Sequence, residues 1–101
     1  MSELIKKVSE MIEEEVEGAE QYAVCAVKHK EDAPALAKVF YDIAGEELRH
    51  VSLLHGEVVR MIEQHRRDHG EPPAAMLAVY DYLHEKQIKA VNSVRMILQQ
   101  F

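Results

Sequence analysis

The chain has 101 residues, of which 48% are hydrophobic and 30% are charged, and its formal net charge is −6 at pH 7. We predict a single helical domain over residues 1–101, because this length supports one modest core. The acidic balance argues against nucleic acid as a partner, since phosphate binding requires a basic face. No segment is apolar enough to span a membrane. A lone cysteine, Cys25, and an amino terminus without the apolar core of a signal peptide predict a cytoplasmic protein.

The first predicted helix covers residues 3–29, because its apolar residues recur at helical spacing. Its stripe consists of Leu4, Val8, Met11, Ile12, Glu15, Ala19, Tyr22 and Ala26. At about 100° per residue, Glu15 falls near the middle of this stripe. Pro34 ends the break that follows, since proline suits the first turn of a helix and disfavours helix just before it.

The second predicted helix covers residues 34–68. Its stripe consists of Leu36, Phe40, Ile43, Ala44, Glu47, Val51, Leu54, Val58, Met61 and Ile62. Glu47 falls near the middle of the stripe, and His50 projects from the same side because it is three residues further on. Gly70 and the two prolines after it are a typical stop signal for a helix.

The third predicted helix covers residues 73–100. Its apolar face consists of Met76, Val79, Tyr80, Leu83, Ala90, Val91, Val94, Ile97, Leu98 and Phe101. Tyr82 and Ile88 lie beside that face and add more apolar surface than one three-helix unit needs. We therefore predict an all-α, antiparallel helix hairpin with a third helix, assembled as a homodimer or a larger oligomer.

We predict a metal site, because it explains why two carboxylates lie in the middle of apolar stripes. Glu15 and Glu47 lie at similar distances from the turn between the first two helices, so antiparallel packing brings them to one level. A buried carboxylate without a partner costs several kcal/mol, and no lysine or arginine shares the stripe centres. A bound cation is the expected neutraliser. Two carboxylates with the imidazole of His50 suit iron, manganese or zinc.

The segment Glu15-Val16-Glu17-Gly18-Ala19-Glu20-Gln21-Tyr22, with Glu47-Leu48-Arg49-His50, resembles the ferritin-like superfamily, which includes rubrerythrins and carboxylate-bridged di-iron proteins. It is most similar to the short encapsulated-ferritin type, in which each of two chains supplies half of the site. The resemblance implies a four-helix bundle completed by dimerisation, with two iron ions at the dimer interface and manganese or zinc as alternatives. It implies that Glu15, Glu47 and His50 are both the metal ligands and the catalytic residues. Glu17 would lie on the path by which iron enters, and Tyr22 would lie beside the metals.

The function implied by the resemblance is ferroxidase activity, the oxidation of Fe(II) by dioxygen or peroxide, with iron storage as a related role. The sequence has no four-cysteine rubredoxin site, so reduction of peroxide would need a separate electron-transfer partner. The sequence does not identify a second protein that would form a shell around this one. The alternative is a non-catalytic helical assembly or interaction protein, with or without structural zinc or manganese. Asp81 and His84 on the third helix form an Asp-x-x-His, but we do not assign them to the site.

Overall fold

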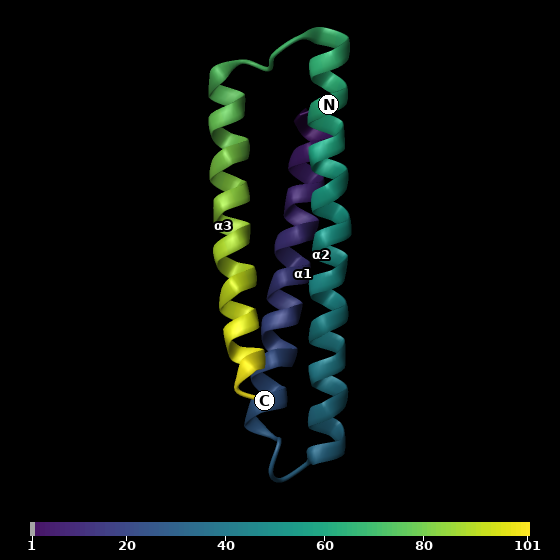
Figure 1. Cartoon of the computed structure of the whole chain (residues 1–101), viewed down its shortest axis with the longest axis vertical. Coiled ribbons are helices and arrows are strands. Elements are labelled where there is room, and N and C mark those ends of the chain that lie inside the picture. Colours follow the sequence, from purple (N-terminus) through teal and green to yellow (C-terminus); the bar gives the residue numbers. More distant parts are fainter. Residues whose placement is uncertain (1) are drawn as a thin grey trace.

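The computed structural model describes residues 2–101, and in this range the chain forms three α-helices and no strand. They are α1 (Ser2–Lys28), α2 (Pro34–His69) and α3 (Ala74–Gln99), each ending within one residue of its predicted bounds. The helices lie alongside one another in a rod of 56 × 17 × 17 Å (Figure 1). The all-α prediction is confirmed. None of the helices in residues 2–101 is both long enough and apolar enough to cross a membrane.

The two connections follow from local sequence. Pro34 is the first residue of α2, where its missing N–H would have no helical partner. Gly70 has a φ of +81°, which favours glycine, and its N–H donates to the carbonyl oxygen of Arg66 at 3.0 Å. The carbonyl oxygen of Pro73 then accepts hydrogen bonds from the N–H groups of Met76 and Leu77 and starts α3. Proline and glycine therefore set the helix ends.

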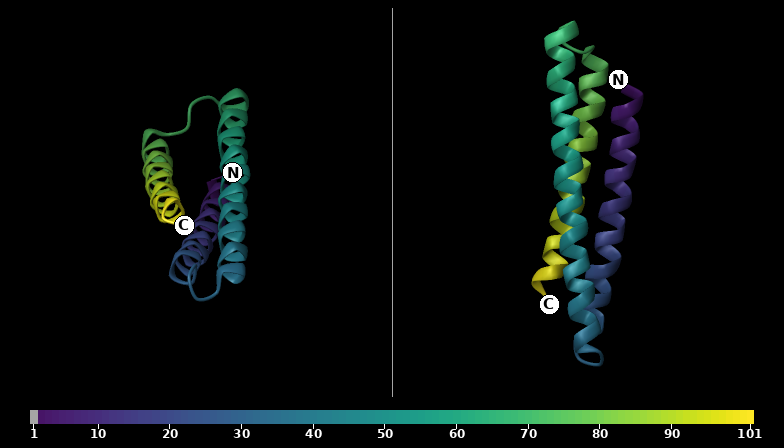
Figure 2. Two further views of the ribbon diagram at one scale, coloured as in Figure 1. Left: turned by 60° about the horizontal axis from the view of Figure 1, so that its bottom comes forward. Right: turned by 90° about the vertical axis from the view of Figure 1, so that its right-hand side faces the viewer.

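Helix α1 is the central element, because it packs along both α2 and α3, whereas α2 and α3 approach each other much less closely. Figures 1 and 2 show the connection between α2 and α3 arching across the space between them. At the opposite end of the rod, Lys30 Nζ donates to the carbonyl oxygen of Gln100 at 3.0 Å. The rings of Tyr41 and Phe101 stack there with centroids 4.7 Å apart. These contacts fix the end of α3 beside the turn between α1 and α2.

The core explains one error in the predicted pattern. It consists of Ile12, Val16, Ala19, Ala23, Ala44, Leu48, Val51 and Val94. On α1 the predicted stripe is correct at Ile12, Ala19 and Ala26, which are fully buried, but it includes the exposed Leu4 and Met11. It also misses three buried residues, Ile5, Val16 and Ala23. Because α1 contacts two helices, its buried face points between them. The predicted stripe, read from α1 alone, was therefore centred wrongly.

Helix α3 differs from the prediction in a similar way. Gln87 is buried at 7% exposure, although a polar residue was not expected on this face. Val79, which was expected to be buried, is exposed. Tyr82 and Ile88 are exposed, as predicted, and they leave apolar surface on the outside of α3.

Candidate metal centre

The three predicted ligands come together in the structure. Glu15 of α1 and Glu47 and His50 of α2 each offer one ligand atom, and these atoms all lie within 4.8 Å of one another. In residues 2–101 they are the one group of three or more His, Cys, Asp or Glu side chains that lies this close. The antiparallel hairpin brings Glu15 level with Glu47, and the helical repeat places His50 one turn after Glu47.

The cluster is only partly buried in the single chain, so the apolar seam predicted around the two carboxylates is open on one side. The side chain of Glu15 is 30% exposed and that of His50 is 50% exposed. The cause is the orientation of α1, which turns its buried face toward α3 and leaves Glu15 at the edge of its contact with α2. The cluster therefore opens onto the side of the hairpin that faces away from the groove between α2 and α3.

We call this side the outer face. It is formed by Leu4, Val8, Met11, Glu15, Gly18 and Tyr22 of α1 and by Leu36, Phe40, Ile43, Glu47, His50 and Leu54 of α2. Leu4, Met11 and Leu36 are 55%, 44% and 50% exposed, respectively. At about 100° per residue, Leu4 and Met11 project within about 40° of Glu15 around α1. The two carboxylates and the imidazole thus lie in an apolar strip that is exposed at Leu4, Met11 and Leu36 and partly buried against the core at Val8, Tyr22 and Leu54.

The two carboxyl groups shift each other's pKa in opposite directions. Their mutual hydrogen bond is the main cause that lowers the pKa of Glu15 and the main cause that raises the pKa of Glu47. Partial desolvation raises the pKa of both groups, and His50 lowers the pKa of Glu15 further. His50 Nδ1 lies 3.4 Å from Glu15 Oε2. Because two adjacent anions repel, the pair keeps a proton or takes up a cation in its place.

Gly18 lies directly beside Glu47, a contact that sequence analysis did not single out. A Cβ atom at position 18 would lie 3.5 Å from Glu47 Oε2 and 3.8 Å from its Cδ. Gly18 follows Glu15 by three residues and so faces the same side of α1. A glycine inside a helix costs about 1 kcal/mol relative to alanine, and that cost is the signal that would have identified it.

The remaining predicted residues lie near the cluster without joining it. Glu17 is exposed on α1 and lines a shallow pocket with Tyr22, Cys25 and Phe40. The rings of Tyr22 and Phe40 are tilted, with centroids 5.9 Å apart. Cys25 is half-buried and carries a free thiol. His84 lies across the molecule from the cluster and pairs with His55 of α2, a residue that sequence analysis did not single out.

The donor set fits a di-metal site only in part. One chain offers two carboxylates and one imidazole, which suit iron, manganese or zinc. A di-iron bundle uses four glutamates and two histidines. A two-fold copy of Glu15, Glu47 and His50 would complete that set. Comparison of the chain with protein-family models, with curated proteins and with solved structures found no match. The functional argument therefore rests on the geometry of these three residues and of the face around them.

Proposed function

We propose that the chain is a ferritin-like protein that binds two iron ions between two copies of itself and oxidises Fe(II). One observation carries the proposal: the ligand atoms of Glu15, Glu47 and His50 lie within 4.8 Å of one another at the open surface of a helical hairpin. Carboxylate oxygens with one imidazole nitrogen per half-site suit iron, and each half-site leaves coordination positions for a second chain and for an oxidant.

The outer face is the surface on which a second copy of the chain would pack. Exposed leucine and methionine side chains flank the ligand cluster, and burying them against a second copy would remove apolar surface from water at about 25 cal/mol per Å². A two-fold axis through the cluster would place the same strip against itself, which is the commonest form of homodimer. The two hairpins would then form a four-helix bundle with all the ligands inside. The same contact would desolvate the carboxylates and strengthen their need for a cation.

The reaction balances with iron as the substrate. Two Fe(II) ions each lose one electron, and one dioxygen molecule takes both electrons and two protons to leave as hydrogen peroxide. With peroxide as the oxidant, the same two electrons and two protons yield two water molecules. The chain contributes the positions of the ions and the charge that stabilises Fe(III). A bound cation favours the ionised form of Glu47, so iron and protons compete for this carboxyl group as the pH falls.

The second candidate is a non-catalytic helical assembly, with or without structural zinc or manganese. The exposed apolar strip supports it independently of the ligands, because such a strip drives association whatever its chemistry. This candidate predicts a dimer that either binds no stoichiometric metal or holds zinc or manganese without consuming oxygen.

Anaerobic loading separates the two candidates. The metal-free protein receives two equivalents of Fe(II) per dimer without oxygen, then air is admitted, and near-ultraviolet absorbance and oxygen consumption are followed together. We expect oxidation well above the buffer rate, with loss of the excess rate in Glu47→Ala and in His50→Ala. Glu14→Ala is the matched control, since Glu14 is exposed on α1 beside the cluster and should leave the rate unchanged. Oxidation at the buffer rate by the unaltered protein would refute the ferroxidase proposal.

A further inference from the structure

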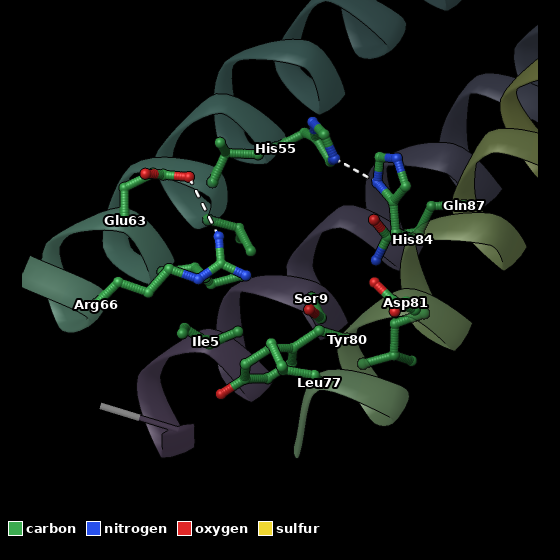
Figure 3. Close-up of a pocket in the computed structure, with 14 residues that line it drawn as sticks. Ile5, Ser9, His55, Glu63, Arg66, Leu77, Tyr80, Asp81, His84 and Gln87 are labelled. Carbon is green, nitrogen blue, oxygen red and sulfur yellow. Dashed lines mark hydrogen bonds and ion pairs between the residues drawn. The ribbon is translucent and has the colours of Figure 1, made fainter. Parts of the chain in front are cut away.

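A pair of histidines bridges the two helices that otherwise hardly touch. His55 Nε2 of α2 lies 2.5 Å from His84 Nδ1 of α3, and the two rings stack with centroids 4.4 Å apart. Figure 3 shows the two imidazoles facing each other across the cavity between the helices. Two ring nitrogens from different helices therefore lie in direct contact. A tetrahedral zinc ion, with Zn–N bonds of about 2.0–2.1 Å, would hold these nitrogens about 3.3 Å apart, so the two rings would separate slightly to admit the ion.

The surroundings of the pair offer further ligands. Asp81 and His84 are three residues apart on α3, so they project from the same side of the helix, as Glu47 and His50 do on α2. Asp81 lines the same cavity, of about 220 Å³, as both histidines (Figure 3). Its carboxylate lies too far away to form a three-ligand group in the present conformation. A rotation of this exposed side chain is therefore the movement that would supply a third ligand.

Gln87 is an independent observation that points to a polar ligand at this place. The residue is 93% buried and lines two cavities next to the histidine pair, yet its Nε2 has no hydrogen-bond partner among residues 2–101. A buried amide without a partner costs roughly 1–3 kcal/mol. Water or a carboxylate held by a metal ion beside His84 would accept this hydrogen bond. A rotation of the amide would present its oxygen instead.

We propose that His55 and His84, with Asp81 as the third ligand, form a second metal site that takes a borderline divalent ion of the zinc class. Imidazole-rich sets favour Zn²⁺, Cu²⁺ and Ni²⁺ over the hard cations. The site is separate from the iron cluster, because it lies in the groove between α2 and α3 and not on the outer face. Its ion would fix α3 to α2, which the protein does not achieve by packing. The proposal does not depend on ferroxidase activity.

The test uses the full chain with the iron cluster disabled by Glu15→Gln and Glu47→Gln together. After treatment with EDTA, the protein is titrated with Zn²⁺ by calorimetry and with Co²⁺ by visible absorption. We expect one ion per chain with the intense absorption of tetrahedral Co²⁺. Adding His84→Ala should abolish this binding, and adding Asp81→Ala should weaken it about tenfold or more. Both residues are exposed, so neither substitution removes core packing.

The matched control is His65→Ala with His69→Ala. These residues form the other close histidine pair, with ring centroids 5.1 Å apart near the end of α2. The control should keep the Co²⁺ spectrum and the stoichiometry of Zn²⁺ binding. The proposal is overturned if the protein binds no ion tighter than about 100 µM, if His84→Ala leaves binding unchanged, or if binding is lost in the control.

Discussion

Replacing Glu47 by glutamine should stabilise the metal-free protein and should remove the proposed binding of iron. The ligand oxygens of Glu15 and Glu47 lie within 4.8 Å of each other. Two unit charges at that separation repel by about 3.5 kcal/mol at an effective dielectric constant of ~20 and by about 0.9 kcal/mol in water. Because the side chain of Glu15 is 30% exposed, the repulsion falls between these limits, at about 1–2 kcal/mol. Glutamine removes the charge and still donates a hydrogen bond to Glu15.

The assay is thermal unfolding in EDTA at one protein concentration, since the melting temperature of a dimer depends on concentration. A gain of 1 kcal/mol corresponds to a rise of about 4–8 °C in a domain of this size. Glu14→Gln is the control, because it removes the same charge from an exposed position of α1 and should change stability by less than about 0.5 kcal/mol.

The pH dependence of the stability gain shows whether repulsion between the two carboxylates causes it. Folding raises the pKa of Glu47 above its ordinary value of 4.5, so the protonated group favours the folded state, and its contribution is lost as pH rises through the raised pKa. Folding lowers the pKa of Glu15, so its contribution is present above pH 4.5 and lost as pH falls through the lowered pKa. The advantage of Glu47→Gln should therefore be full at pH 7 and small near pH 4. A variant less stable than the unaltered protein at pH 7, or an equal advantage at both pH values, would refute this reasoning.

Three further substitutions test the packing around the cluster. Gly18→Ala should stabilise the protein by about 1 kcal/mol, because the new Cβ makes only ordinary contact with Glu47 at 3.5 Å. The Gly18→Ala variant should still bind iron, whereas Gly18→Val should not, because the larger valine side chain displaces the Glu47 carboxylate. Equal iron titrations for the two variants would contradict this expectation. Met11→Lys should convert a dimer into monomers in light scattering, since it puts a charge on the outer face; an unchanged mass would exclude that face as the interface. Ile12→Ala should lower the free energy of unfolding in urea by about 2–5 kcal/mol, because Ile12 is fully buried. A loss below about 1 kcal/mol would show that the core closes around the gap.

The helix ends and the cluster of Glu15, Glu47 and His50 could be predicted from the sequence, because each depends on residues close together in the chain or on one turn. Proline at position 34 and glycine at position 70 mark the ends of α2, and the hairpin between α1 and α2 then brings Glu15 level with Glu47. Each of these steps needs only one helix or one turn. The function inferred from them stays a proposal.

The remaining features of the fold and the site depend on the position of α3, which cannot be predicted from the apolar pattern of one helix. The placement of α3 turns the buried face of α1 away from Glu15, so the open position of the cluster could not be predicted from α1 alone. It also buries Gln87 and brings His55 against His84. His55 does lie at helical spacing from the buried residues Leu48 and Val51, and this periodicity was the available signal.

Four small residues in the core have a consequence for the proposed metal site. Ala19, Ala23, Ala37 and Ala44 are fully buried, and none of them has a side chain that could move aside for a larger neighbour. Any larger residue at these positions would push the two helices apart and lengthen the span between Glu15 and Glu47. Residues that contribute no ligand atom would thereby set the size of the ion that the proposed site accepts.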